Sequence, residues 1–116
     1  MLPKKQRLTA LLLKKLSKER VSFVRTPLFT LRFGALLREL GPRSKFSVTV
    51  SKKELALAVK RNSARRTLYR AVQELYPELK PGVFGIFMVK GDIQIMAYER
   101  VREEVKKALK DAGLFS

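Results

Sequence analysis

The stretch of sequence that decides the fold runs from Val50 to Leu75 and reads VSKKELALAVKRNSARRTLYRAVQEL. Its central part contains neither Gly nor Pro, and its apolar residues recur at the spacing of a helix that is buried on one side. The sequence therefore predicts one long helix in this stretch. The inner stripe of that helix is predicted to consist of Ala64, Leu68, Ala71, Val72 and Leu75.

The exposed surface of this helix is predicted to carry two basic ridges, because residues four positions apart lie above one another on a helix. Guanidinium groups can grip phosphate oxygens in pairs, an Asn amide both donates and accepts, and a Tyr ring can stack on a base. These chemical types suit RNA. The two rows are Arg61, Arg65, Tyr69 and Asn62, Arg66, Arg70.

An Arg-rich helical face can also be a solvated surface without a partner. Between residues 52 and 70, however, seven cations stand against a single acid, Glu54, so that few local ion pairs can neutralise the face. The charge pattern therefore favours contact with a nucleic acid. The seven cations are Lys52, Lys53, Lys60, Arg61, Arg65, Arg66 and Arg70.

The rest of the chain supports a basic surface on a folded core. The 116 residues contain 26 Lys and Arg against 10 Asp and Glu, which gives a formal charge of +16, and 46% of them are hydrophobic. Residues 1–70 hold nineteen basic and three acidic side chains, whereas residues 71–116 hold seven of each. We therefore expect a single domain, residues 1–116, that faces a polyanionic partner with its first two thirds.

The sequence contains no Cys and no His, which restricts the metal sites and the catalytic mechanisms that the protein can have. Without Cys and His, the chain can form no disulfide, no Cys/His zinc module and no imidazole-assisted nucleophile. We expect no catalytic residue and no metal ligand in the protein. The apolar run from Leu11 to Leu13 is too short for a signal segment or a membrane span, so we expect a cytoplasmic protein without a membrane partner.

The segments on either side of the long helix supply the remaining elements. Leucines between residues 8 and 16 recur at helical spacing, and apolar residues alternate over 29–33 and 46–50 as in half-buried strands. We expect these two strands to be antiparallel neighbours, with residues 35–40 as a helical turn or a hairpin excursion between them. Downstream, Val83 to Lys90 (VFGIFMVK) predicts a buried, central strand, and Tyr98 to Asp111 predicts a helix that ends near Gly113.

This order of elements predicts an α+β fold. We expect a small two-layer sandwich, with a mixed β-sheet, an N-terminal helix, a long basic crossover helix and a C-terminal helix. No Gly-rich phosphate loop of the nucleotide-binding types precedes a helix, so a nucleotide-dependent enzyme is not expected.

The phrase VSKK followed by AVKRNSARR resembles the signature helix of the bacterial ribonuclease P protein component. The resemblance covers nearly the whole chain, because MLPKKQRL, RTPLFTLRF, VFGIFMVK and AYERVREEVKKAL also fall in family-like order. The positions that match the family pattern are Lys52, Lys53, Ala58, Val59, Arg61, Asn62 and Arg66, and Arg65 stands where the family usually has Lys.

The chain resembles a divergent member of that family. Ser63 stands where the family has the second Arg of an Arg-Asn-Arg core, and Tyr69 stands where it has a later Arg. One residue is inserted between Lys53 and Ala58. These departures put direct phosphate contacts at Ser63 and Tyr69 in doubt.

The resemblance implies a division of labour within ribonuclease P, an endoribonuclease that removes the 5′ leader of precursor tRNA. The RNA subunit would hold the catalytic Mg²⁺ ions, while the protein, without a cofactor or a further protein partner, would bind that RNA and the leader. The RNA-binding residues would be Lys52, Lys53, Lys60, Arg61, Asn62, Arg65, Arg66, Tyr69 and Arg70. The family places the leader in a cleft between sheet and helix, where Phe29, Phe33 and Phe46 are candidates for stacking on its bases, although each could instead be core.

Two other kinds of protein fit the composition. A structural ribosomal or general RNA-binding protein would bind RNA without stimulating cleavage. A stand-alone metal-dependent nuclease would use Asp92 and the glutamates around Glu103, but no paired carboxylates fall among the predicted strands. A DNA-binding module remains possible on charge alone, without a helix-turn-helix or zinc motif to support it.

Overall fold

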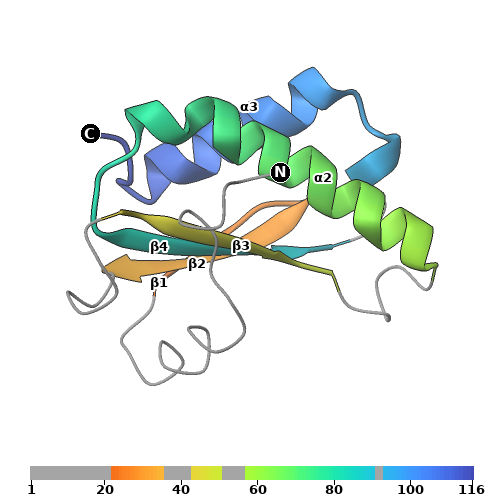
Figure 1. The fold of residues 1–116 in the computed structure, drawn as a ribbon, viewed down its shortest axis with the longest axis horizontal. Helices are drawn as coiled ribbons and strands as arrows, with labels where there is room; N and C mark the ends of the chain where they lie inside the picture. The colour runs from red at the N-terminus through yellow and green to blue at the C-terminus, as the bar shows by residue number, and fades with distance from the viewer. Residues whose placement is uncertain (1–21, 36–42, 51–56, 91–92) are drawn as a thin grey trace.

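A computed structural model describes residues 22–35, 43–50, 57–90 and 93–116 of the chain (Figure 1). The predicted N-terminal helix lies outside these residues, and so does the predicted excursion between the first two strands, apart from Ala35. In chain order the elements are β1 (Ser22–Arg25), β2 (Phe29–Ala35), β3 (Lys45–Thr49), α2 (Ala58–Leu75), the 3-10 turn η3 (Tyr76–Glu78), β4 (Val83–Val89), the 3-10 turn η4 (Ile93–Ile95) and α3 (Tyr98–Asp111).

The four strands form one mixed sheet in the order β1-β2-β4-β3. β1 pairs with β2 and β2 with β4 in antiparallel fashion, whereas β3 and β4 are parallel. The mixed sheet, the central position of β4 and the crossover of α2 from β3 to β4 are all as predicted. The α+β fold class is therefore confirmed.

One expectation about the sheet is wrong. β2 and β3 are not neighbours, because β4 lies between them. The helix α2 returns the chain across the sheet, so that β4 can enter beside β3 in parallel. Most of β4 is buried, and a strand with so little exposed surface is most favourable in the middle of a sheet.

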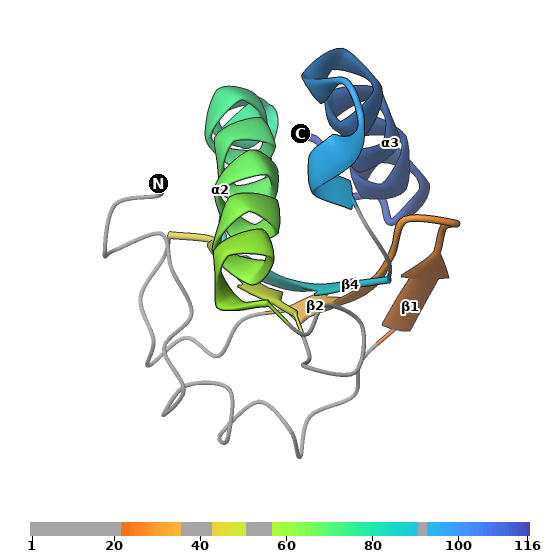
Figure 2. The ribbon, with the colours of Figure 1, turned by 90° about the vertical axis from the view of Figure 1, so that its right-hand side faces the viewer.

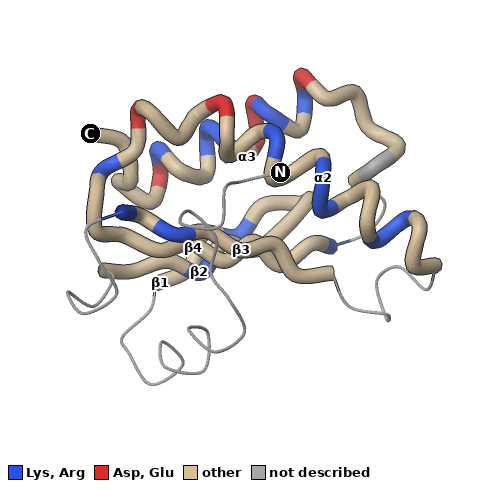
Figure 3. Tube along the Cα trace, in the orientation of Figure 1, with Lys and Arg blue, Asp and Glu red and all other residues tan. Residues whose placement is uncertain are grey.

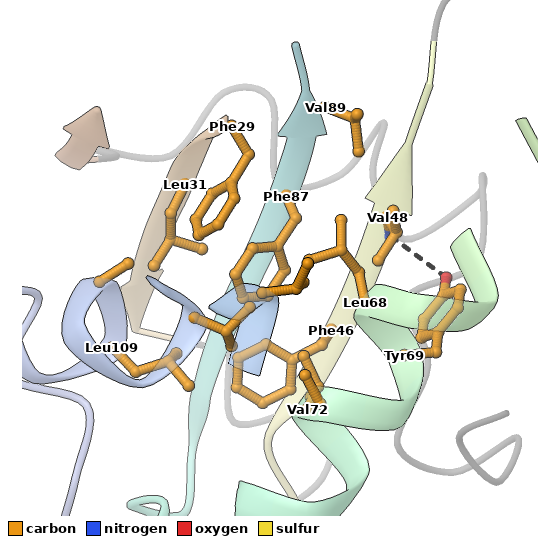
Figure 4. Close-up of a cluster of buried hydrophobic side chains, with 14 of the residues drawn as sticks. Phe29, Leu31, Phe46, Val48, Leu68, Tyr69, Val72, Phe87, Val89 and Leu109 are labelled. Carbon is orange, nitrogen blue, oxygen red and sulfur yellow. Dashed lines mark hydrogen bonds between the residues drawn. The ribbon is translucent and has the colours of Figure 1, made fainter. Parts of the chain in front are cut away.

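Both described helices cover the same face of the sheet (Figure 2). The core lies between them and that face, where Leu31, Phe87 and Val48 form one row across β2, β4 and β3. Figure 4 shows these side chains meeting Leu68 and Val72 of α2. The predicted inner stripe of α2 is buried in full, and so are the α3 residues Val101, Val105, Ala108 and Leu109.

Local hydrogen bonds fix the ends of the elements that matter for the site. Thr26 turns β1 into β2, because its hydroxyl accepts from the Phe29 amide at 3.0 Å and donates to the Phe29 carbonyl at 3.0 Å. At the end of α3, the Leu114 amide donates to the Leu109 carbonyl and the Gly113 amide to the Lys110 carbonyl, with a φ of 72° at Gly113. This is the helix stop that the sequence predicts at Gly113, since glycine adopts positive φ at least cost.

Candidate nucleic-acid interface

The first half of α2 carries a dense group of cations without an acid among them. Figure 3 shows Lys and Arg spaced along this helix. Leu57 makes no side-chain cap, and the first turn of α2 contains no acidic residue. Among the described residues, therefore, no carboxylate within the helix neutralises the positive end of the helix dipole. We call this group the α2 basic face; it consists of Lys60, Arg61, Asn62, Arg65 and Arg66.

Asn62 and Arg65 are held to each other on this face. The Arg65 Nη1 group donates a hydrogen bond to Asn62 Oδ1 at 2.6 Å, across one turn of the helix. The bond orients the Arg65 guanidinium while leaving donors available for a phosphate. Lys60, Asn62 and Arg66 are exposed, and Arg61 and Arg65 are half-buried.

Tyr69 does not belong to this surface, contrary to the sequence prediction. Its side chain is 8% exposed and lies in the core beside β3. The Val48 amide donates to the Tyr69 hydroxyl at 3.2 Å, as Figure 4 shows. β3 is an edge strand of the described sheet, and the phenol provides this buried amide with a hydrogen-bond partner.

Replacing Tyr69 by Phe tests this structural role. The variant removes the acceptor and leaves the Val48 amide buried, so we expect a loss of about 1–3 kcal/mol in the free energy of unfolding. Urea denaturation measures this loss. RNA affinity, measured on the folded variant, should stay at the wild-type value; a large drop in affinity with unchanged stability would restore Tyr69 to the interface.

Arg70 turns toward α3 and does not join Asn62 and Arg66 on a second ridge. Its guanidinium lies 3.8 Å from the centre of the Tyr98 ring, and its Nε is 3.7 Å from the Glu74 carboxylate. The Tyr98 hydroxyl donates to Glu74 at 2.9 Å, and Arg102 Nε lies 3.4 Å from the same carboxylate. These contacts join α2 to α3 on the surface, so Arg70 has partners within the protein. We call this group of four side chains the clasp; it consists of Arg70, Glu74, Tyr98 and Arg102.

The clasp gives Tyr98 an unusual titration. Burial, followed by the hydrogen bond to Glu74, raises the pKa of Tyr98 from 10.0 to about 12. The protonated phenol therefore stabilises the fold below pH 10.0, and this contribution disappears as the pH rises through about 12. In Glu74→Gln we expect the pKa of Tyr98 to move back toward 10.0, as measured by the NMR shift of its ring carbon. Tyr98→Phe identifies the signal, and a wild-type Tyr98 that already titrates near 10.0 would exclude the clasp in solution.

The three aromatic candidates for base stacking do not present free rings. Phe29 and Phe46 are 0% exposed, and Phe33 is partly buried and packs against the same core. The alternation of each strand places these side chains on the face that α2 and α3 cover. The prediction that Phe29 or Phe46 stacks on a base is therefore wrong, because both side chains belong to the hydrophobic core.

An exposed aromatic residue lies on the opposite face of the sheet, where sequence reasoning did not place it. Phe23 of β1 is 49% exposed and pairs across the strands with Arg32 of β2. The guanidinium carbons of Arg25 and Arg32 lie 5.9 and 5.8 Å from its ring centre. Arg32 Nε is buried without a hydrogen-bond partner in the described part of the chain. The hairpin register could have indicated this group, since it sets Phe23 opposite Arg32.

Three of the remaining predicted positions lie outside the residues that the structure describes. They are Lys52, Lys53 and Asp92. Within residues 22–35, 43–50, 57–90 and 93–116, no three acidic side chains gather in a way that could hold a metal ion. None of the helices in these ranges is both long and apolar enough to cross a membrane.

The chain thus folds as a small α+β protein whose long crossover helix carries a cationic surface. A family model described as "Ribonuclease P" matches residues 2–113. The chain belongs to the ribonuclease P protein family.

Named relatives agree with this family. The ribonuclease P protein component of Herpetosiphon aurantiacus is 32% identical over 66 residues, which are 57% of this chain and 54% of that protein. The Microcystis aeruginosa protein of the same name is 34% identical over 74 residues, 64% of this chain and 61% of its own length. The matched stretch thus spans less than two thirds of these relatives.

Solved structures show the same fold. A mutant RNase P protein of Staphylococcus aureus, described as defective in mRNA degradation activity, superimposes with a TM-score of 0.81 at 19% identity and covers 97% of this chain and 92% of its own. The RNase P protein of Thermotoga maritima gives a TM-score of 0.76 at 16% identity, over 90% of this chain and 96% of its own. At these identities the likeness concerns the fold.

Proposed function

We propose that this protein is the non-catalytic subunit of ribonuclease P. It binds the catalytic RNA and precursor tRNA in the cytoplasm and assists the removal of the 5′ leader. The observation that carries the proposal is the α2 basic face, with four cations and no acid on one half of a helix, in a chain of this family. Lys52 and Lys53, which precede α2 in the sequence, extend the proposed RNA contact.

The physical role of such a protein is electrostatic. A substrate RNA held against a catalytic RNA is repelled by it, and a cationic protein that contacts both reduces that repulsion. Binding then needs less Mg²⁺. The ions themselves are held by the RNA subunit, and the protein contributes no cofactor, general acid or general base.

Multiple-turnover cleavage of a precursor tRNA by a bacterial ribonuclease P RNA at low Mg²⁺ tests the proposal. Wild-type protein should stimulate cleavage, and Arg61→Ala/Arg65→Ala should lose most of the stimulation. Lys106→Ala/Lys107→Ala on α3 removes the same charge from another surface and should stay close to wild type. Binding without stimulation would favour a ribosomal or general RNA-binding protein, and cleavage by the protein alone would favour a nuclease.

We further propose that the leader contacts the exposed ring of Phe23 on the edge strand β1, and not the buried rings of Phe29 and Phe46. A half-exposed ring beside two guanidinium groups offers a base a stacking partner and its phosphate a charge-assisted hydrogen bond.

Phe23→Ala is therefore expected to weaken the binding of precursor tRNA by about 1–3 kcal/mol, the contribution of one stacked base. Binding of mature tRNA, which has no leader, should not change. Ile95→Ala is the matched control, because Ile95 is an apolar side chain that is 78% exposed on another surface. An equal loss for both tRNAs would remove Phe23 from the leader contact.

A further inference from the structure

A second group of cations lies beyond the C-terminal end of α2. Figure 3 shows Lys and Arg along α2 and again at the beginning of β3, toward the other end of the molecule. Arg43 and Lys80 are both exposed there, and they line a surface cavity of about 340 Å³. None of the residues that the proposed function uses for RNA contact lines this cavity, which lies just beyond the C-terminal end of α2.

The walls of this cavity are preformed. The Tyr76 hydroxyl donates to the Ser44 carbonyl at 2.7 Å, and the Ser44 hydroxyl donates to the Lys80 carbonyl. The Val83 amide in turn donates to the Ser44 hydroxyl at 3.1 Å. These hydrogen bonds connect the start of β3 to the segment between α2 and β4. The cavity therefore exists before a ligand binds, and binding requires no rearrangement of its walls.

The lining combines an apolar wall with cations. Tyr76, Pro77, Leu79 and Pro81 provide the wall, and no acidic residue lines the cavity among the described residues. Burial raises the pKa of Tyr76, and the positive charge of Arg43, which lines the same cavity, opposes that rise. The lining therefore suits a ligand that has an apolar part beside an anionic part.

The size of the cavity restricts the choice further. Ligand pockets in proteins span about 300–1,000 Å³, so this one accepts a single small group. One unpaired nucleotide fits the cavity in three respects. Its base can pack against the apolar wall, its phosphate can bind the cations, and its size is within that of a small ligand. A base inside a duplex does not fit, because its faces are covered by its neighbours.

We propose that this cavity is a second RNA contact, which holds one unpaired nucleotide with its base against Pro77 and Pro81 and its phosphate between Arg43 and Lys80. The inference rests on the proposed function for one point, that the partner is RNA. Tyr76 follows Arg61 by 15 residues, nearly all of them helical, so the two contacts are about 22 Å apart along α2. Two contacts at this separation fix the orientation of the protein on the RNA, whereas one contact would leave it free to pivot.

Salt-dependent binding to a bacterial ribonuclease P RNA tests the charged part of the site. In Arg43→Gln/Lys80→Gln, we expect the slope of log affinity against log salt to become shallower by about 1, because the contact with one phosphate is lost. Arg43→Lys/Lys80→Arg keeps both charges and should keep the wild-type slope. Lys106→Gln/Lys107→Gln removes two exposed cations from α3 and should change the slope by less than half as much.

Cross-linking tests the nucleotide itself. Because the sequence contains no Cys, Lys80→Cys provides a single attachment point for a photoactivated cross-linker. We expect cross-links to a small set of unpaired nucleotides in the RNA, which the wild-type protein should also protect from chemical modification of the base. Lys107→Cys, with the same cross-linker, should give far fewer.

The outcomes separate this inference from the proposed function. If the wild-type protein fails to stimulate cleavage, the proposed function fails. If it stimulates cleavage, but the Gln pair at residues 43 and 80 behaves like the pair on α3 and the two cysteine variants cross-link equally, the second contact is overturned alone. Cross-links confined to paired nucleotides would also overturn it.

Discussion

Raising the salt concentration from about 50 to about 200 mM is expected to weaken the binding of this protein to ribonuclease P RNA by about 10³- to 10⁵-fold. The estimate assumes about six to ten phosphate contacts, by analogy with duplex DNA. It follows from the charge of +16 and from the first half of α2, which carries four cations and no acidic residue of its own. Each contact releases counterions from the RNA, and added salt opposes that release. Titrations at several salt concentrations measure the slope.

A triple variant locates the source of this dependence. Arg61→Ala/Arg65→Ala/Arg66→Ala should make the slope shallower by about 3, one for each lost contact. The matched control, Lys106→Ala/Lys107→Ala/Lys110→Ala, removes three cations from α3, where glutamates balance the charge. Equal changes in the two variants would mean that net charge alone, and not the α2 basic face, determines binding. A flat salt response of the wild-type protein would contradict the RNA-binding proposal.

The helices of this fold could be predicted closely because their pattern is local. The inner stripe of α2 and the inward residues of α3 follow from the helical period, and the stop at Gly113 follows from glycine chemistry. Tyr69 was misplaced for a reason that is not local. Tyr69 borders the inner stripe of α2, where a tyrosine can face the core or the solvent. Its inward position depends on a distant residue, because its hydroxyl accepts a hydrogen bond from the Val48 amide on β3.

The strands show the same limit. Alternation correctly groups Phe29, Leu31 and Phe33 on one face of β2, but it does not reveal which face the helices will cover. That choice depends on the crossover of α2, which brings β4 between β2 and β3. The sequence does not single out Phe23, because its place beside Arg32 depends on the pairing register of β1 and β2. The turn at Thr26 determines that register.

Replacing Gly85 by Val is expected to reduce the free energy of unfolding by about 3 kcal/mol or more, at the upper end of the cost of overpacking a core. Gly85 lies in the middle of β4, between Phe33 and Phe46 on the two neighbouring strands. A Cβ atom at this position would lie 2.7 and 2.8 Å from two ring carbons of Phe46 and 3.3 Å from Leu31. Contacts under 3.0 Å require one of the groups to move.

The Phe46 ring has no room to withdraw. It is completely buried and packs against Tyr76 at 6.2 Å and Phe87 at 6.5 Å between ring centres, so a shift would disturb both. Glycine at position 85 thus allows a large aromatic ring to lie across the centre of the sheet. Even Gly85→Ala, which gains a little from the reduced freedom of the unfolded chain, should cost about 1–3 kcal/mol.

Urea denaturation of a double-mutant cycle distinguishes this clash from a general intolerance of β4. Phe46→Leu alone leaves a gap above Gly85 and should be destabilising. Combined with Gly85→Ala, the smaller leucine makes room for the new methyl group, which fills part of that gap. The double variant should therefore be more stable than the sum of the two single losses predicts. Additive losses would show that the ring of Phe46 and the missing side chain of Gly85 are not coupled, and that glycine is required there for another reason.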